Sequence, residues 1–173
     1  MKFPLVLLGF MASGKSALGK KMAHQLNVPF TDTDQMIEER EKMGIGKIFK
    51  QKGENYFRSL EKELIQNLDY SKKQVIAIGG GTACYPEILM FLKDRASLIY
   101  LQLPKEILIG RLRSEKHKRP LTAELSDEEI KQMVVQKMRE REPFYLQADF
   151  IVKNPNATAK KILAEIGLSV ERE

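Results

Sequence analysis

The sequence lacks the features that would place a protein outside the cell or in a membrane. It contains a single cysteine, Cys84, which cannot form an intramolecular disulfide and therefore agrees with a reducing compartment. No apolar run approaches the roughly 20 residues that a membrane-spanning helix needs, because the run from Leu5 to Leu8 stops at Gly9 and Lys15 follows soon after. These absences predict a cytoplasmic protein with no membrane partner.

A nucleic-acid-binding signature is also missing, although the formal net charge is +6. The lysines are scattered, without interleaved aromatic residues or an RNA-binding motif. We therefore expect most of them to lie on a solvated surface, and we expect no nucleic-acid partner. A basic balance equally suits a protein that binds anionic small molecules.

The length of 173 residues and the hydrophobic content of 43% bound the architecture. A chain of this length can bury one hydrophobic core and is too short for two domains of ordinary size. We expect a single domain over residues 1–173 that works as a monomer.

Short apolar strands alternate with longer amphipathic helices along the chain. Because the strands are nearly continuous apolar runs, they suit a parallel sheet covered by helices on both faces, a three-layer α/β/α fold. Ser126 and Glu129 form a capping-box pattern, Asn156 is expected to cap the last helix, and the polar segment 114–125 predicts a mobile loop. The expected strands are Pro4–Leu8, Val28–Asp32, Gln74–Ile78, Ser97–Leu101 and Phe150–Val152, and the expected helices are Ser16–Leu26, Glu54–Leu68, Pro86–Lys93, Lys105–Arg113 and Asp127–Arg141.

Residues 9–16 read GFMASGKS and fit the phosphate-loop pattern G-x-x-x-x-G-K-[ST] between the first strand and the first helix. Glycines let backbone N–H groups surround phosphates, Lys15 can reach the β and γ phosphates, and Ser16 can ligate Mg²⁺. A chance match in a loop is the alternative, and the strand–loop–helix context disfavours it. The pattern predicts binding of a nucleoside triphosphate with Mg²⁺.

Two carboxylates follow the second expected strand, in the stretch FTDTDQ from Phe30 to Gln35. If this stretch is extended, Asp32 and Asp34 share one face of the strand. Asp32 is the candidate for organising Mg²⁺, because the strand Ser97–Leu101 is followed by Gln102 and supplies no carboxylate. Asp34 suits a group that accepts a proton from an attacking hydroxyl, and it equally suits the cap of a helix from Gln35 to Glu41.

Further candidates lie at strand ends and in the polar loop. The three glycines from Gly79 to Gly81 permit close backbone approach to a ligand, or form a tight turn. Arg119 in the polar loop is either a mobile arginine that reaches a transferring phosphate or an ordinary surface residue. Arg58 and Arg141 bind a ligand or pair with nearby glutamates on their helices.

Taken together, these motifs resemble the shikimate kinase family in order and spacing, over nearly the whole chain. The stretches that carry the resemblance are GFMASGKS, the DTD from Asp32 to Asp34, GENYFRSLE around Arg58, GGG at Gly79, RPL at Arg119 and REPFY at Arg141. The resemblance implies a P-loop kinase fold with a five-stranded parallel sheet, a lid at about 114–125 and a shikimate-binding helical segment at about 33–62. It also implies transfer of the ATP γ-phosphoryl group to the 3-hydroxyl of shikimate, a step of the shikimate pathway of aromatic amino acid biosynthesis.

The resemblance assigns roles residue by residue. It implies that Asp34 acts as the base, that Lys15 and Arg119 support phosphoryl transfer, and that Ser16 and Asp32 serve Mg²⁺. The shikimate ligands that it implies are Asp34, Arg58, Gly80 and Arg141. Arg113 and Pro155 are expected to flank the adenine. The implied ATP site as a whole consists of Gly9, Ala12, Ser13, Gly14, Lys15, Ser16, Ala17, Arg113, Arg119 and Pro155.

The sequence departs from the family pattern at two positions. Ala12 stands where glycine is common, which costs about 1–2 kcal/mol if the position needs a positive φ. Thr122 stands where a second leucine is usual after Leu121, which concerns the packing of the lid. The alternatives are a P-loop kinase of another hydroxy acid such as gluconate, and a nucleotide-binding regulatory or nucleic-acid-associated protein that transfers no phosphate. Neither needs the DTD together with paired arginines.

Overall fold

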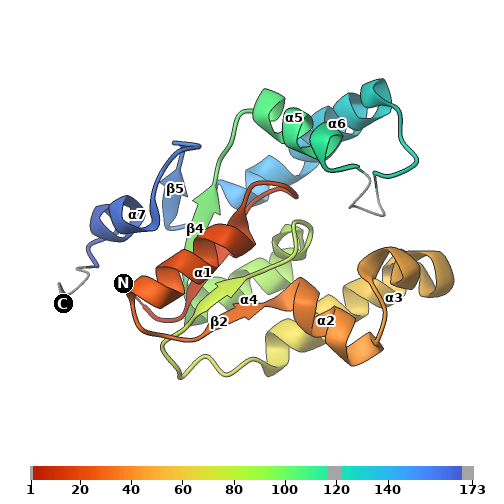
Figure 1. Ribbon diagram of the computed structural model, residues 1–173. Coiled ribbons are helices and arrows are strands. Elements are labelled where there is room, and N and C mark those ends of the chain that lie inside the picture. Colours follow the sequence, from red (N-terminus) through yellow and green to blue (C-terminus); the bar gives the residue numbers. More distant parts are fainter. Residues whose placement is uncertain (1, 117–121, 169–173) are drawn as a thin grey trace.

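A five-stranded parallel sheet forms the centre of the computed structural model, which describes residues 2–116 and 122–168 (Figure 1). The strand order is β2-β3-β1-β4-β5, and every neighbouring pair is parallel. The strands are β1 (Leu5–Leu8), β2 (Phe30–Asp32), β3 (Val75–Ala77), β4 (Ser97–Leu101) and β5 (Phe150–Val152). All five expected strands are confirmed, with small differences at their ends.

Helices cover both faces of the sheet because successive side chains of each central strand point to opposite faces, and the side chains on both faces are apolar. On β1, Leu5 and Leu7 pack toward α1 and α7, whereas Val6 and Leu8 pack toward α4 and α6. The predicted three-layer α/β/α fold is therefore confirmed. The helices are α1 (Lys15–Gln25), α2 (Thr33–Glu41), α3 (Ile45–Asn67), α4 (Pro86–Arg95), α5 (Lys105–Ser114), α6 (Asp127–Tyr145) and α7 (Ala159–Glu165), with a 3-10 turn, η1, at Thr82–Cys84.

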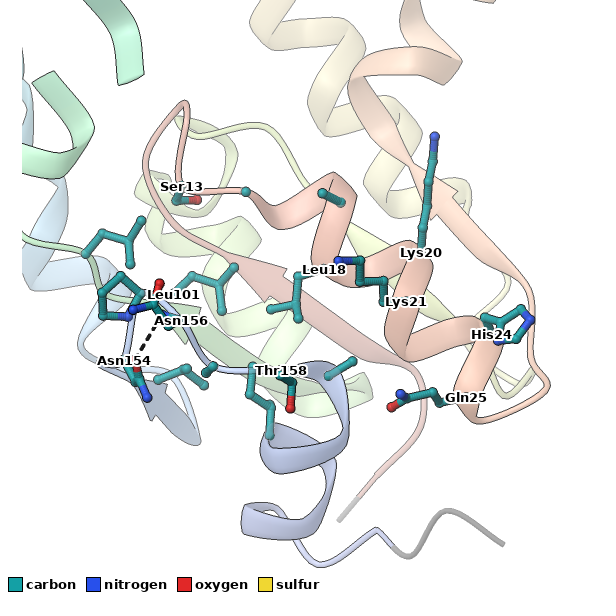
Figure 2. A pocket seen from close by; sticks show the side chains of 18 of the residues that line it. Ser13, Leu18, Lys20, Lys21, His24, Gln25, Leu101, Asn154, Asn156 and Thr158 are labelled. Atoms are coloured by element: carbon teal, nitrogen blue, oxygen red, sulfur yellow. Dashed lines mark hydrogen bonds between the residues drawn. The ribbon is translucent and has the colours of Figure 1, made fainter. Parts of the chain in front are cut away.

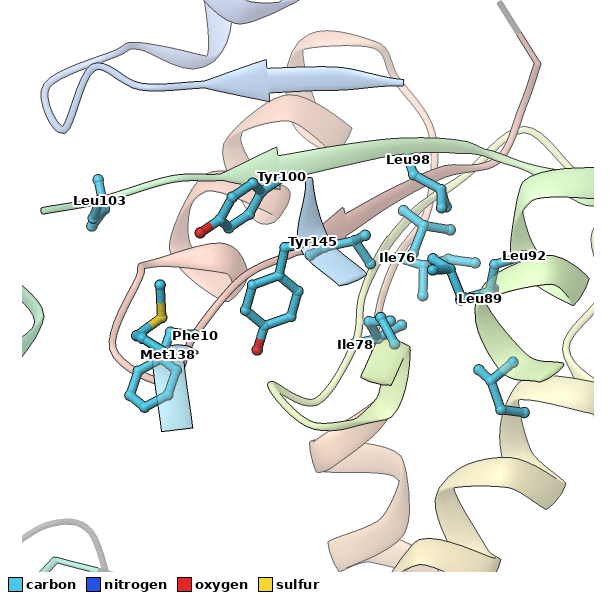
Figure 3. Packing of buried hydrophobic residues seen from close by; sticks show 14 of the residues in the cluster. Phe10, Ile76, Ile78, Leu89, Leu92, Leu98, Tyr100, Leu103, Met138 and Tyr145 are labelled. Carbon is cyan, nitrogen blue, oxygen red and sulfur yellow. The ribbon is translucent and has the colours of Figure 1, made fainter. Parts of the chain in front are cut away.

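The larger core lies between the sheet and α4 and α6 (Figure 3). Two tyrosines belong to it: Tyr100 from β4 and Tyr145 from the last turn of α6, each about 1% exposed, with ring centroids 5.0 Å apart. This contact fixes the C-terminal turn of α6 against the sheet, close to the carboxyl ends of the strands.

Helices α2 and α3 form a separate layer beside the edge strand β2 (Figure 1). They share a small apolar cluster that includes Ile37, Ile48 and Phe57. Helix α3 begins at Ile45, nine residues before the expected Glu54, and its two halves meet at Gly53, where φ is 82° and ψ is 167°. The glycines at 44, 46 and 53 lower the helix propensity of the first half, so the sequence does not predict it as a helix. Burial of Ile48 in a core stabilises it as a helix.

Two helix-terminus predictions can be compared with the structure. The capping box of Ser126 and Glu129 at α6 is confirmed, since each side chain bonds the other residue's backbone N–H. The expected cap at Asn156 is wrong: Thr158 caps α7 by accepting from the Lys161 N–H at 3.3 Å, whereas the Asn156 N–H donates to Asn154 Oδ1 in the preceding turn. In the described residues, no helix is both long and apolar enough to span a bilayer.

The phosphate loop contains a strained residue. Ala12 has a φ of 62°, in the left-handed region where a Cβ costs about 1–2 kcal/mol. Position 12 therefore does adopt a positive φ, which is the condition under which an alanine there is strained.

We expect Ala12→Gly to raise the free energy of unfolding by about 0.5–1 kcal/mol, because relief of strain exceeds the extra entropy of an unfolded glycine chain. Ala17, in the right-handed helix α1, is the matched control, and Ala17→Gly should lower the same quantity by about 0.5–1 kcal/mol. Urea unfolding of both variants measures the difference. Equal losses in the two variants would contradict the strain at Ala12.

Candidate active site

The phosphate loop connects β1 to α1 at the carboxyl edge of the sheet. Lys15 folds its ammonium group over the loop, donating to Gly9 O at 2.8 Å and Phe10 O at 3.0 Å. Gly14, with a φ of 94°, permits the turn into α1, whose first N–H groups have no acceptor within the helix and receive no side-chain cap from Gly14. Free N–H groups, the positive end of the helix dipole and a lysine together make an anion site.

Asp32 connects three elements at the end of β2. Its Oδ2 accepts a hydrogen bond from Ser16 Oγ at 2.5 Å, and its Oδ1 accepts from the N–H groups of Asp34 at 3.1 Å and Gln35 at 3.4 Å. Asp32 therefore caps α2, which starts at Thr33. An extended Asp32–Asp34 pair and a cap at Asp34 are both wrong, because the helix starts at Thr33, two residues before the expected Gln35.

Asp32 and Asp34 nevertheless face one cavity. This phosphate-side cavity has a volume of about 420 Å³ and is lined by the loop, by both aspartates and by Gly80. Helix capping, rather than strand alternation, brings the two carboxylates together. The arrangement places a carboxylate beside the Ser16 hydroxyl and a second carboxylate deeper in the site.

Asp34 is the most perturbed acid of the site. Burial raises its pKa to about 6; Lys15 opposes this shift, whereas Glu61, Asp32 and Glu38 add to it. Its Oδ1 is buried without a hydrogen-bond partner among the described residues. A carboxylate that titrates close to neutrality is suited to accepting a proton.

A second cavity, the acceptor-side cavity, has a volume of about 410 Å³ and opens between α2, α3 and α6. Arg58 lies in its wall and is held by two glutamates: Nη2 and Nε donate to Glu54 Oε1 at 2.8 and 3.1 Å, and Nη1 donates to Glu61 Oε2 at 2.6 Å. The Glu61 side chain is only 2% exposed. Arg58 thus pairs with helix glutamates and also lines a cavity, so the two alternatives left by the sequence coexist.

The three glycines after β3 make room for side chains of the site. A Cβ on Gly79 would overlap the Glu61 carboxylate and lie 2.9 Å from Asp34 Oδ1. A Cβ on Gly81 would lie 2.8 Å from Arg58 Nη1. Substituted residues at these two positions would displace the charged groups of the site.

Gly80 is fixed through its carbonyl oxygen, which accepts from Arg141 Nη1 at 3.2 Å and from the Tyr145 hydroxyl. Arg141 and Tyr145 both come from the end of α6, so the REPFY motif joins this helix to the glycine run. Tyr145 was not among the sequence candidates. Its position four residues after Arg141, on the same helix face, is the signal that points to it.

A third cavity, of about 740 Å³, lies between α1 and the segment that joins β5 to α7 (Figure 2). Pro155 lines it, as do Ser13, Gly14 and Ala17 from the loop and the start of α1. The arginine in its wall is Arg111, whose Nη1 donates to Ala12 O at 3.0 Å and to Ser13 O at 3.2 Å.

Arg113, the residue expected near the adenine, bonds elsewhere: its Nη2 donates to Asp127 O at 2.9 Å, at the start of α6. Two residues along a helix differ by roughly 200° in direction, so Arg111 and Arg113 point to different neighbours. The adenine role of Arg113 stays a prediction, but Arg111 is the arginine that shares a cavity with Pro155. Prediction of secondary structure alone cannot tell which of the two arginines faces the cavity, because it does not show which face of α5 packs inward.

Arg119 is one of residues 117–121, which lie outside the described residues. Thr122, just after them, is fully buried and lines the acceptor-side cavity, so the residue that departs from the family pattern forms part of that wall. Glu124 in the same segment pairs with Lys50 of α3 at 2.9 Å.

The chain is similar to known shikimate kinases in sequence and in fold. The family model for shikimate kinase matches residues 11–171. A shikimate kinase from Aquifex aeolicus is 38% identical over 96% of this chain and 95% of its own length. The solved structure of shikimate kinase from Bacteroides thetaiotaomicron is similar with a TM-score of 0.86 at 31% identity, over 95% of this chain and 98% of that one. The structure of the enzyme from Acinetobacter baumannii in complex with shikimate gives a TM-score of 0.82 at 31% identity, over 94% and 89%.

The two stacked tyrosines yield a stability prediction. Tyr145→Phe removes the donor to Gly80 O and should lower the free energy of unfolding by about 1 kcal/mol. Tyr100→Phe is the matched control: its hydroxyl is buried without a partner among the described residues, so its removal should be neutral or slightly stabilising. Urea unfolding measures both, and an equal cost for both variants would show that the Gly80 contact contributes nothing specific.

Asp34 yields a pH prediction. Because its folded pKa of about 6 lies above the usual 3.8, the folded state binds more protons between these values, and stability falls as pH rises through this window. Asp34→Asn should therefore be more stable than the parent protein above pH 6, by on the order of 2–3 kcal/mol, with little difference below pH 4. Chemical unfolding across pH 4–8 tests this, and a difference independent of pH would reject the assignment to this carboxyl.

Proposed function

Because the chain belongs to the shikimate kinase family and is an ATP-dependent kinase of shikimate, we propose that Asp34 marks the point where the phosphoryl group passes between the substrates. The supporting observation is that Asp34 and Gly80 line both the phosphate-side and the acceptor-side cavity. A group at this boundary reaches the acceptor hydroxyl and the γ-phosphate together.

In the proposed reaction the 3-hydroxyl oxygen of shikimate attacks the γ-phosphorus, and the bond from that phosphorus to the ADP oxygen breaks. Asp34 accepts the hydroxyl proton, and its raised pKa suits this transfer near neutral pH. Lys15 balances the charge on the β and γ phosphates, for which its ammonium group leaves the Gly9 and Phe10 carbonyl groups.

The residues of the phosphate-side cavity fit Mg²⁺. Ser16 Oγ and Asp32 Oδ2 are adjacent, and the described residues contain no cluster of three or more His, Cys, Asp or Glu that would enclose a metal by itself. Mg²⁺ typically uses one or two protein groups, with phosphate oxygens and waters as its other ligands. We assign Ser16 as the direct ligand and Asp32 to its outer shell; when bound, the ion neutralises phosphate charge.

For the acceptor, we propose that Arg58 and Arg141 bind the carboxylate of shikimate and that Asp34 and the Gly80 backbone address its hydroxyls. Arginine suits a carboxylate because its planar fork offers parallel donors. The glutamates that hold Arg58 fix its orientation before the acceptor arrives.

For the nucleotide, we propose that the loop from Gly9 to Ala17 binds the phosphates and that the base lies in the cavity lined by Arg111 and Pro155. Arg111 lines that cavity, and Arg113 remains a proposed neighbour of the adenine beside it. Arg119 is proposed as the lid arginine, within the segment 114–125 of a single P-loop kinase domain.

The remaining proposals concern the setting of the enzyme. We propose a monomer that acts on small-molecule substrates without nucleic acid, as the scattered lysines and the single-domain length of the sequence suggest. The requirement for ATP favours the cytoplasm.

The test is a coupled ADP-release assay with shikimate, gluconate or no acceptor, followed by two variants. Asp32→Asn should raise the Mg²⁺ concentration needed for activity by about 10–100-fold, and asparagine still caps α2. Asp34→Asn should retain the Mg²⁺ and ATP dependence but lower kcat by about 10²–10⁴-fold and weaken shikimate binding.

Lack of turnover with shikimate in a folded sample would refute the proposed reaction. The same defect in both variants would show that the two aspartates act as one metal site.

A further inference from the structure

Helix α6 places a lysine in the acceptor-side cavity. Met133, Lys137 and Arg141 all line it, and their spacing of four residues puts them on one face of α6. Lys137 is one helical turn from Arg141, and both cations face the same space.

The three cations of this cavity differ in whether they form an ion pair with a carboxylate of the protein. Arg58 already donates to Glu54 and Glu61. Neither Lys137 nor Arg141 forms an ion pair with any residue in the part of the chain that the structure describes. The two cations of α6 therefore have no carboxylate partner among the described residues, whereas Arg58 would bind a ligand while its guanidinium is also held by two glutamates.

Glu54 marks the place where a carboxylate is stable in this cavity. It accepts two hydrogen bonds from Arg58, and the nearby charges of Lys137 and Arg141 also help to lower its pKa. Three cations thus act on one exposed carboxylate at the cavity wall. A ligand carboxylate in the neighbouring space meets the same positive field.

The acid groups of the wall would repel an anionic ligand unless nearby cations offset their charge. Asp34, Glu38, Glu54 and Glu61 line the cavity and repel an anionic acceptor. Four acid groups in this wall face only two arginines, Arg58 and Arg141. Lys137 raises the number of cations to three and so reduces the excess of negative charge that an anionic acceptor meets.

We propose that Lys137 is a specificity-determining residue that, together with Arg141, binds the carboxylate of the acceptor; this rests on the proposed function, in which the acceptor is shikimate. The ammonium group forms a charge-assisted hydrogen bond with a carboxylate oxygen and selects an acid over a neutral analogue.

The experiment compares shikimate with its uncharged methyl ester as acceptors, in the parent enzyme and in Lys137→Met, which keeps the length of the side chain and removes the charge. For each enzyme the ratio of kcat/KM for the acid to kcat/KM for the ester is measured. We expect Lys137→Met to lower this ratio by about three- to tenfold, mainly through a higher KM for the acid, with KM for ATP unchanged. The ratio does not depend on the fraction of folded enzyme.

Two controls define the result. Lys137→Arg should restore most of the ratio, since it keeps the charge. Lys131→Met, on the same helix but outside the cavity and paired with Glu128, should leave the ratio unchanged. An unchanged ratio in Lys137→Met, or an equal fall in Lys131→Met, overturns the proposal.

The outcome is separable from that of the proposed function. If the parent enzyme phosphorylates shikimate and Lys137→Met keeps the parent ratio, only the role of Lys137 fails. If the parent enzyme does not phosphorylate shikimate, the proposed function fails and this role fails with it.

Discussion

The carboxylate of Asp32 is the contact on which the geometry of the site depends. One oxygen receives the Ser16 hydroxyl of α1, and the other receives the first free N–H groups of α2. A single side chain thus fixes the start of the nucleotide-side helix relative to the start of the acceptor-side helix. Asp34 is directed into the site because α2 begins where Asp32 ends β2.

The interior of the site concentrates negative charge, and the structure compensates for it with specific neighbours. Glu61 is buried against Arg58 and Thr82, and Asp34 lies close enough to Glu61 for their charges to interact. Gly79 and Gly81 make this possible, because any side chain there would occupy the space of the charged groups. The result is a carboxyl that is harder to ionise, with a pKa raised toward neutrality, as the proposed proton acceptor requires.

Helix α6 connects the chemistry to the core. Its N-terminal capping box and its buried residues position it against the sheet, and its last turn delivers Arg141 and Tyr145 to Gly80. Tyr145 also packs on Tyr100 (Figure 3), so the position of the acceptor-side arginine is set by the same contact that closes the core. In the same way, Arg111 of α5 fixes the phosphate loop by donating hydrogen bonds to the carbonyl oxygens of Ala12 and Ser13.

The sequence by itself determined the strands, the sheet type, the phosphate loop and the motifs that carry the family resemblance, because apolar runs and glycine patterns are local properties. Tertiary structure alone decided which side chains meet. Residues 33–34 turn into a helix because Asp32 caps it, the first half of α3 forms because Ile48 finds a core, and Arg111 rather than Arg113 reaches the loop because one face of α5 packs inward. The approach of Lys137 to the α3 side of the cavity and of Tyr145 to Gly80 likewise depends on elements that are far apart in sequence. Local pattern fixes the period of an element, but only packing fixes which face it turns to its neighbours.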